Sequence, residues 1–197
     1  VVGVEIDAQR DERKRFENNF GERGSLTTNQ DEDVTGYAVY LQDELHLRDD
    51  LRLTLGQRYD VLDYDVNDKT GSGSGSRTFE QPSPMIGLLW KTATSANLYG
   101  NVSTSFEPPT TTELANPLGV TGFNPSLEAQ KATNYEIGIK GLLPARSRYE
   151  VALFHIDLED ELVPFELAGS GQTFYENAGE STRNGLEASL VIQPLAG

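Results

Sequence analysis

The side chains that could do chemistry are few, and two histidines come first. His46 and His155 are the only imidazoles in the 197 residues, and a transition-metal or haem site would need further ligands beside either one. His46 alternates with Gln42 and Glu44, and His155 lies near Asp157. A polar, water-facing wall explains these neighbours as well as a metal or proton site does. We therefore assign no metal ligand and no cofactor to them.

Acidic clusters are the second candidate. Carboxylates gather at Asp157–Glu161, at Asp31–Asp33, and at Asp63 and Asp65 near Asp68. Carboxylate oxygens suit Ca²⁺, but none of these stretches has the Asp-x-Asp-x-Asp-Gly spacing of a calcium loop. The clusters are more typical of a solvated surface at the edges of loops.

Catalytic motifs are missing from the sequence. It contains no cysteine nucleophile, no Gly-x-Ser-x-Gly elbow, no phosphate-binding glycine loop and no His-Glu-x-x-His. Glu136 and Glu187 could form an acid/base pair, but their strand positions predict a water-filled setting. We predict that the protein is not an enzyme and assign no catalytic residue.

Composition narrows the class of protein. A net charge of -15 argues against nucleic acid as a partner, because binding to phosphates needs clustered Lys and Arg. The mean hydropathy is -0.47, and no run of roughly 18 apolar residues exists that could form a helical membrane span. A membrane β-barrel is still compatible with these values, because only every second residue of its strands faces lipid.

The elements that would position these side chains are strands. In Val34–Arg48, for example, Val39, Leu41 and Leu45 alternate with polar residues, the pattern of a strand with one apolar face. The sequence predicts an all-β chain of about eight antiparallel strands: Val1–Phe16, Val34–Arg48, 51–61, Ser83–Thr92, Asn97–Phe106, Ala132–Leu142, Arg148–Leu158 and Arg183–Ile192. In Arg148–Leu158 the apolar residues change face midway, which predicts a bulge or a strand that rises beyond the membrane.

The connections between these strands alternate in length. Short ones lie at Asp49-Asp50, Ala93–Ala96 and Leu143–Ser147, and long ones lie at Glu17–Asp33, Asp65–Gln81, Glu107–Lys131 and Glu159–Thr182. Up-and-down membrane barrels have this asymmetry, with short periplasmic turns and long outer loops. A soluble sandwich has no physical reason for it.

Three stretches resemble one family, the TonB-dependent outer-membrane receptors. Asn97–Leu114 (NLYGNVSTSFEPPTTTEL) is similar to its strand that ends in an aromatic residue, Pro-Pro and a Thr-rich loop start. Asn124–Gly141 (NPSLEAQKATNYEIGIKG) resembles its N-P-x-L-x-x-E-x-x-x-x-Y-E-x-G-x-K pattern, with Gln130 at a position where Glu is frequent. Asn177–Leu190 (NAGESTRNGLEASL) is similar to its N-A-G entry into a descending strand.

This resemblance implies a transmembrane barrel of 22 strands around a plug, in the outer membrane of a Gram-negative cell. Residues 1–197 would be part of the barrel domain, with the plug and the TonB-contacting segment absent. The implied function is energised uptake of a scarce ligand, most often a ferric siderophore or another iron complex. The implied partners are outer-membrane lipid, TonB and the small-molecule ligand.

Two further features bear on ligand contacts. Five phenylalanines near the long loops could line a vestibule, or they could be aromatic anchors at the membrane interface or pack between loops. We assign no site to them: Phe79, Phe106, Phe123, Phe165 and Phe174. Gly71–Ser76 (GSGSGS) predicts a flexible coil, either a natural loop tip or an engineered replacement of a longer loop.

Two alternatives remain open from the residues. A passive porin-like barrel would share the strand pattern and the loop asymmetry. A soluble β-sandwich binding module also has one apolar face per strand, but its apolar rows would meet in a closed core.

Overall fold

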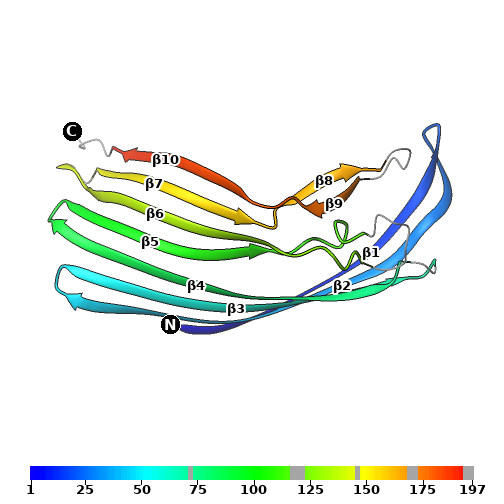
Figure 1. Ribbon diagram of the computed structural model, residues 1–197, viewed down its shortest axis with the longest axis horizontal. Coiled ribbons are helices and arrows are strands. Elements are labelled where there is room, and N and C mark those ends of the chain that lie inside the picture. Colours follow the sequence, from blue (N-terminus) through cyan, green and yellow to red (C-terminus); the bar gives the residue numbers. More distant parts are fainter. Residues whose placement is uncertain (71–72, 116–122, 145–146, 168–172, 193–197) are drawn as a thin grey trace, which may run out of the picture.

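A single antiparallel sheet forms most of the molecule (Figure 1). The computed structural model describes residues 1–70, 73–115, 123–144, 147–167 and 173–192. Eight strands form the sheet in the order β1-β2-β3-β4-β5-β6-β7-β10, and β8 and β9 form a separate hairpin. The strands are β1 Val2–Asn19, β2 Glu22–Arg48, β3 Leu51–Asp68, β4 Gly75–Ala93, β5 Ala96–Glu107, β6 Gln130–Leu142, β7 Arg148–Glu159, β8 Leu162–Glu166, β9 Thr173–Asn177 and β10 Ser181–Val191.

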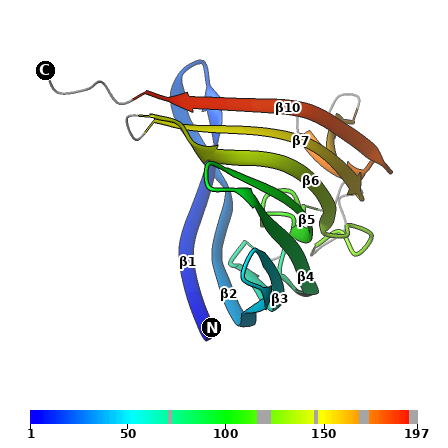
Figure 2. The same cartoon turned by 90° about the vertical axis from the view of Figure 1, so that its left-hand side faces the viewer.

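The predicted all-β, up-and-down arrangement of about eight strands is confirmed, because each strand of the sheet pairs with its sequence neighbour until β7 meets β10. Seen along the strands, the sheet is an arc with β1 and β10 at its two ends (Figure 2). Within the described ranges, no helix is long and apolar enough to cross a membrane.

An apolar belt covers one face of the sheet. The register aligns seven residues from β2 to β10 in one row: Leu45, Leu53, Leu88, Gly100, Ile137, Leu153 and Leu186. Ile137 is 64% exposed and Leu186 is 66% exposed. The adjacent row points to the other face and is mostly polar or glycine: Glu44, Thr54, Gly87, Asn101, Glu136, Phe154 and Gly185. The sheet therefore has an apolar outer face and a polar inner face.

The short turns confirm two predictions, whereas two predicted long loops are wrong. Asp49-Asp50 joins β2 to β3, and Thr94-Ser95 joins β4 to β5. Glu17–Asp33 is not a loop, because β1 and β2 continue to a turn at Phe20-Gly21, where both residues have positive φ.

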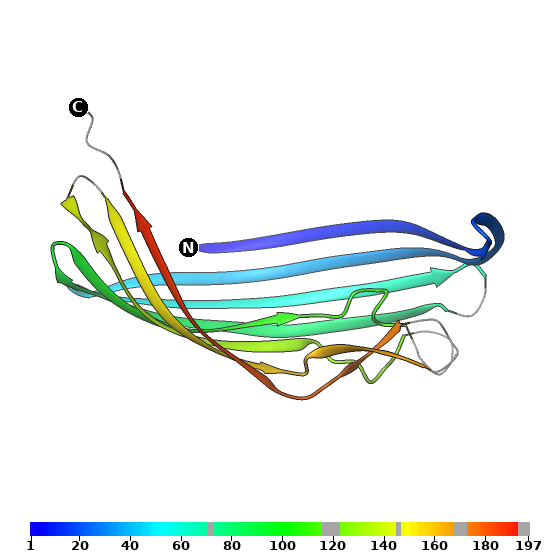
Figure 3. The ribbon, with the colours of Figure 1, turned by 90° about the horizontal axis from the view of Figure 1, so that it is seen from above.

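Asp65–Gln81 is also mostly strand, within β3 and β4. The first four strands therefore reach farther toward the loop end than β5 to β7 do (Figure 3). These extensions lack alternating apolar residues, so the sequence pattern did not mark them as strand. The low-complexity stretch Gly71–Ser76 is only partly described. Gly71 and Ser72 lie outside the described residues, and Gly75 and Ser76 begin β4.

Two more predictions need correction. Of the two explanations given for Arg148–Leu158, the bulge is wrong, because β7 pairs in continuous register with both β6 and β10; the other, a strand that rises beyond the membrane, stays a prediction. The apolar residues on its second face are covered instead: Leu158 is 4% exposed, and the Phe154 ring lies against Gly185. The long connection Glu159–Thr182 contains the hairpin of β8 and β9, which the sequence reading missed.

Gly141 gives a sharp test of how the sheet is packed at the short-turn end. A Cβ added there would lie 1.8 Å from the backbone oxygen of Ser95. Backbone gives way less easily than a side chain, so we predict that Gly141→Ala lowers the free energy of unfolding of the full-length protein by ~1–3 kcal/mol.

The control for Gly141→Ala is Gly100→Ala, whose new methyl would meet its nearest neighbour, the Glu136 carbonyl oxygen, at an ordinary 3.5 Å. Denaturant titration in detergent micelles measures both variants. Equal loss of stability in the two would contradict this packing.

Candidate functional site

The connection between β5 and β6 folds against the inner face of the sheet. Its described parts, residues 108–115 and 123–129, are called the inner strap below; Figure 2 shows this green segment on the inner side of the arc. Leu114 and Leu127 of the strap are 0% and 1% exposed. They form a core cluster with Tyr64 and Phe79, which project from β3 and β4. The strap therefore covers the inner face of the sheet at its loop end.

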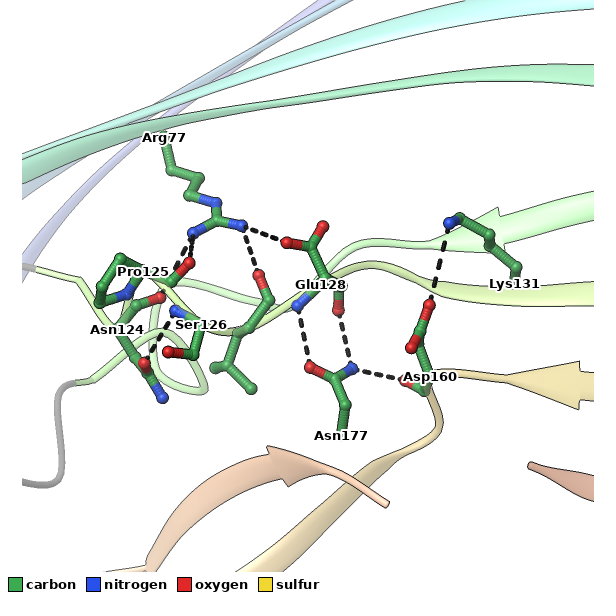
Figure 4. Close-up of polar contacts among 9 residues, drawn as sticks. Arg77, Asn124, Pro125, Ser126, Glu128, Lys131, Asp160 and Asn177 are labelled. Carbon is green, nitrogen blue, oxygen red and sulfur yellow. Dashed lines mark hydrogen bonds and ion pairs between the residues drawn. The ribbon is translucent and has the colours of Figure 1, made fainter. Parts of the chain in front are cut away.

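Arg77 of β4 holds one end of the strap (Figure 4). Its guanidinium donates to the carbonyl oxygens of Pro125 at 2.6 Å and Leu127 at 2.5 Å. Longer contacts reach the Asn124 carbonyl at 3.5 Å and the Glu128 carboxylate at 3.3 Å. The planar fork of arginine suits several acceptors at once, which a lysine ammonium does not match.

Asn177, the last residue of β9, connects the strap to the β8–β9 hairpin (Figure 4). Its side-chain oxygen accepts from the Glu128 backbone N–H at 2.9 Å, and its side-chain nitrogen donates to the Glu128 carbonyl at 3.1 Å. The same nitrogen donates to the Asp160 carbonyl at 2.6 Å. One amide therefore satisfies backbone groups in two different loops.

A buried ion pair holds the other end of the strap. Glu32 of β2 is 4% exposed, and its carboxylate lies 2.9 Å from the Arg13 Nε of β1. The Thr111 hydroxyl donates to the Glu32 carboxylate, and Arg13 donates to the Thr112 hydroxyl. The strap residues thus complete the hydrogen bonding of both charges.

Tyr64 is buried where the strap packs on the sheet. Burial raises the pKa of the Tyr64 phenol, and the nearby Glu113 carboxylate of the strap raises it further. Both effects disfavour a phenolate. Tyr64 therefore acts here as a neutral aromatic side chain that packs edge-on against Phe79.

Below the strap, the inner face carries a polar groove of about 540 Å³ along β1 to β3. Arg58 lies in it, 2.9 Å from the Glu5 carboxylate and 2.8 Å from the Asp60 carboxylate. Asp7 lines the same groove. The groove is therefore lined by acidic side chains and by one guanidinium, that of Arg58, which pairs with two of them.

Aromatic rings cover glycines on this inner face. Tyr99 faces Gly138, and Phe154 faces Gly185, as direct partners across neighbouring strands. A Cβ on either glycine would meet the ring at 2.6 Å or less. Each ring thus occupies the space that a side chain at the glycine would need.

The two histidines lie apart and have ordinary polar partners. His46 is 3.0 Å from the Glu44 carboxylate, and His155 lies between Asn184 at 2.7 Å and Asp157 at 2.8 Å. Across the described parts of the chain, no group of three or more His, Cys, Asp or Glu side chains could hold a metal ion.

The predicted acidic clusters meet basic side chains. Asp31 pairs with Lys69 at 2.6 Å, and Asp33 pairs with Arg10. Asp63 accepts from Thr78 at 2.7 Å. These contacts make the clusters part of a charged surface on the strand extensions.

The five phenylalanines are packed against protein. Phe79 is 5% exposed, and Phe106 and Phe123 pack against its core cluster. Phe165 and Phe174 face each other across β8 and β9 with ring centroids 6.1 Å apart. The structure thus places these rings against neighbouring rings and apolar side chains of the strands and loops.

Among the residues that build the site, Glu32 was named from the sequence as part of the acidic cluster Asp31–Asp33, but its burial contradicts the solvated surface predicted there. Arg13, Arg77 and Asn177 were not singled out as functional residues. Asn177 does open the N-A-G motif and Asn124-Pro125 opens the longest one, so motif position was an available signal for these. Arg13, Glu32 and Arg77 lie in no motif, and their contacts span 19 to 99 residues of sequence.

Comparison with known proteins settles the family. The model of the family described as TonB dependent receptor-like, beta-barrel matches residues 2–195. This chain belongs to the TonB-dependent receptor family. The resemblance drawn from the three motifs is confirmed.

The metal-pseudopaline receptor CntO of Pseudomonas aeruginosa is 28% identical to this TonB-dependent receptor chain over 169 residues. The match covers 82% of the chain and 22% of CntO, so the chain spans about a fifth of the length of this relative. The matched proteins are named as receptors and transporters, not as enzymes.

Solved structures share the fold. The ferripyoverdine receptor of the Pseudomonas aeruginosa outer membrane superposes with a TM-score of 0.69 at 22% identity, over 100% of this chain and 28% of that one. The ferric citrate transporter FecA gives 0.70 at 18% identity, over 95% of this chain and 28% of that one. The copper transporter OprC gives 0.70 at 16% identity, over 95% and 32%.

The buried ion pair supplies a test of the strap's attachment. Arg13→Ala leaves the Glu32 carboxylate buried without its counterion, so we predict a loss of about 3 kcal/mol in the free energy of unfolding of the full-length receptor. Denaturant titration and protease sensitivity of the strap measure the effect.

Arg10→Ala is the control for Arg13→Ala. It removes a neighbouring arginine of the same strand, whose pairing with Asp33 is solvent-exposed, and exposed pairs stabilise little. If Arg10→Ala were as damaging as Arg13→Ala, burial would not be what makes the Glu32 pair important.

Proposed function

We propose that this chain is a barrel-wall segment of an outer-membrane receptor that takes up a metal chelate, an iron complex such as a ferric siderophore. The observation that carries the proposal is the two-faced sheet of a TonB-dependent receptor, with an exposed apolar belt outside and a polar, strap-covered wall inside. The belt would face lipid, and the inner wall would face the path of the ligand.

The height of the belt supports a membrane setting. Its rows run from Trp90 and Leu98, near the short turns, up to Tyr37 and Tyr59. Aromatic residues at both borders are typical of the two interfaces of an outer membrane. The short turns would then face the periplasm, and the strap and the β8–β9 hairpin would face the outside.

The relatives support a metal chelate as the ligand class. Their names specify metal-pseudopaline, ferripyoverdine, ferric citrate and copper. We propose that all 197 residues belong to the barrel domain and that the plug, which contacts TonB, lies in another part of the same receptor. The chain would form part of the wall along which the ligand passes.

The alternatives fit less well. A β-sandwich would bury its apolar rows between two sheets, whereas here the row through Ile137 and Leu186 is exposed. A passive porin needs no TonB-dependent receptor sequence, and the family match covers residues 2–195.

Uptake by the whole receptor tests the proposal directly. We predict that deleting its gene abolishes growth on, and cellular accumulation of, at least one labelled metal chelate from a panel of ferric siderophores, ferric citrate and nickel, zinc and copper chelates. Removing TonB from the parent strain should abolish the same uptake, because transport is energised. Unchanged accumulation of every chelate would overturn the proposed ligand class, and uptake without TonB would favour a passive pore.

The membrane setting has its own test. Ile137→Arg places a charge in the middle of the apolar belt, and we predict a loss of ~2–4 kcal/mol in the stability of the barrel in lipid. Asn101→Arg, on the adjacent inner row beside Glu136, should be tolerated. The folding yield of the full-length receptor in lipid vesicles measures both variants. A larger loss of yield in Asn101→Arg than in Ile137→Arg would contradict the proposal that the apolar belt faces lipid.

A further inference from the structure

The inner strap is held from three separate elements of the fold. Arg77 holds it from β4, Asn177 holds it from β9, and Glu32 with Arg13 holds it from β2 and β1. Leu114 and Leu127 bury their side chains between these attachments. A movement of the strap away from the wall would have to break all of these contacts.

The chemistry of the attachments favours a fixed position. The strap has little regular structure, so some of its carbonyl groups are bonded by side chains instead of by a neighbouring strand. A carbonyl without a donor is costly where it is buried, as at Leu127. Arg77 satisfies those of Pro125 and Leu127, and Asn177 satisfies the one of Glu128. Moving the strap away would expose Leu114 and Leu127 to water and would strip Glu32 of the Thr111 hydroxyl.

A ligand-driven movement would have to offset all of these losses. A ligand shifts a conformational equilibrium only by the difference between its affinities for the two states. The strap lies on the inner wall at the loop end, where a ligand would arrive first, so a strap that stays in place acts through its shape.

We propose that the inner strap is a permanent constriction of the ligand path, and that Arg77 and Asn177 are positioning residues that hold it there. The strap then discriminates between metal chelates by size and shape. This proposal rests on the proposed function for its ligand class, but the fixed position of the strap is testable without any ligand.

The first experiment measures strap order in the purified, full-length receptor by hydrogen exchange. Arg77→Lys keeps the positive charge but loses the planar fork, and Asn177→Asp keeps the shape but sets a carboxylate against two carbonyls. We expect strap amides to exchange roughly tenfold faster or more in both variants, because the buried carbonyls lose their donors.

Matched controls separate positioning from a general loss of charge or amide. Arg183→Lys changes an arginine that pairs with Glu161, and Asn184→Asp changes an asparagine that bonds His155. Neither touches the strap in the contacts described above, so strap exchange should be unchanged. Equal exchange in all four variants and the wild type would overturn the positioning role.

The second experiment asks whether the strap must move during uptake. Cysteines replacing Glu128 of the strap and Asp160 of the loop after β7, whose backbone carbonyls both accept from the Asn177 amide, can be joined by a reversible bifunctional thiol reagent in intact cells. We expect the same rate of chelate uptake by this double variant before and after linking. Uptake that stops on linking and returns on reduction would identify a moving lid and would overturn the proposal.

The third readout concerns selectivity. In Arg77→Lys and Asn177→Asp, the ratio of uptake of bulky to compact chelates should rise several-fold over that of the wild type, while both control variants keep the wild-type ratio. An unchanged ratio with a disordered strap would refute the selectivity role. If the wild type took up no chelate, the proposed function would fail, yet hydrogen exchange would still report on the strap.

Discussion

The alternation of side chains along paired strands is the constraint on which the rest of this structure depends. Because the strands keep their register across the apolar belt, one residue step moves a side chain from the belt to the polar inner wall. The row through Leu53 and Ile137 and the row through Thr54 and Glu136 are immediate neighbours with opposite environments. The backbone hydrogen bonds are made within the sheet, so the outer face is free to be apolar and the inner face to be polar.

The backbone carbonyl groups of the inner strap also need hydrogen-bond donors, but they find them in a different way from those of the sheet. A strand satisfies its carbonyl groups through its neighbours, but an irregular segment folded onto a wall must find donors elsewhere. Here the donors are multivalent side chains, the Arg77 guanidinium and the Asn177 amide, each of which bonds several backbone groups. Apolar side chains alone could have buried Leu114 and Leu127, but they would have left these carbonyls unpaired.

The contrast between paired strands and the irregular strap explains how much of the structure could be predicted from the sequence. Where strands cross the apolar belt, alternation was readable, and Ala132–Leu142 was predicted within two residues of β6. Above the belt both faces are polar, so Glu17–Asp33 resembled a loop although it continues β1 and β2. The site depends on pairs such as Arg77 with Pro125, which are 48 residues apart. No local pattern encodes such a pair, because it arises only when the sheet curves and the strap folds back.

The open edges of the sheet decide how such a segment can exist. Within the described residues, β1 and β10 each pair with one neighbour only. In the hydrocarbon layer an unpaired backbone edge costs several kcal/mol per group, so under the proposed membrane setting both edges would need partner strands. The chain spans 28% of the ferripyoverdine receptor, whose fold it shares. The contacts described for the strap, by contrast, lie within this segment, so this stretch of sequence carries the residues that hold the strap on the wall.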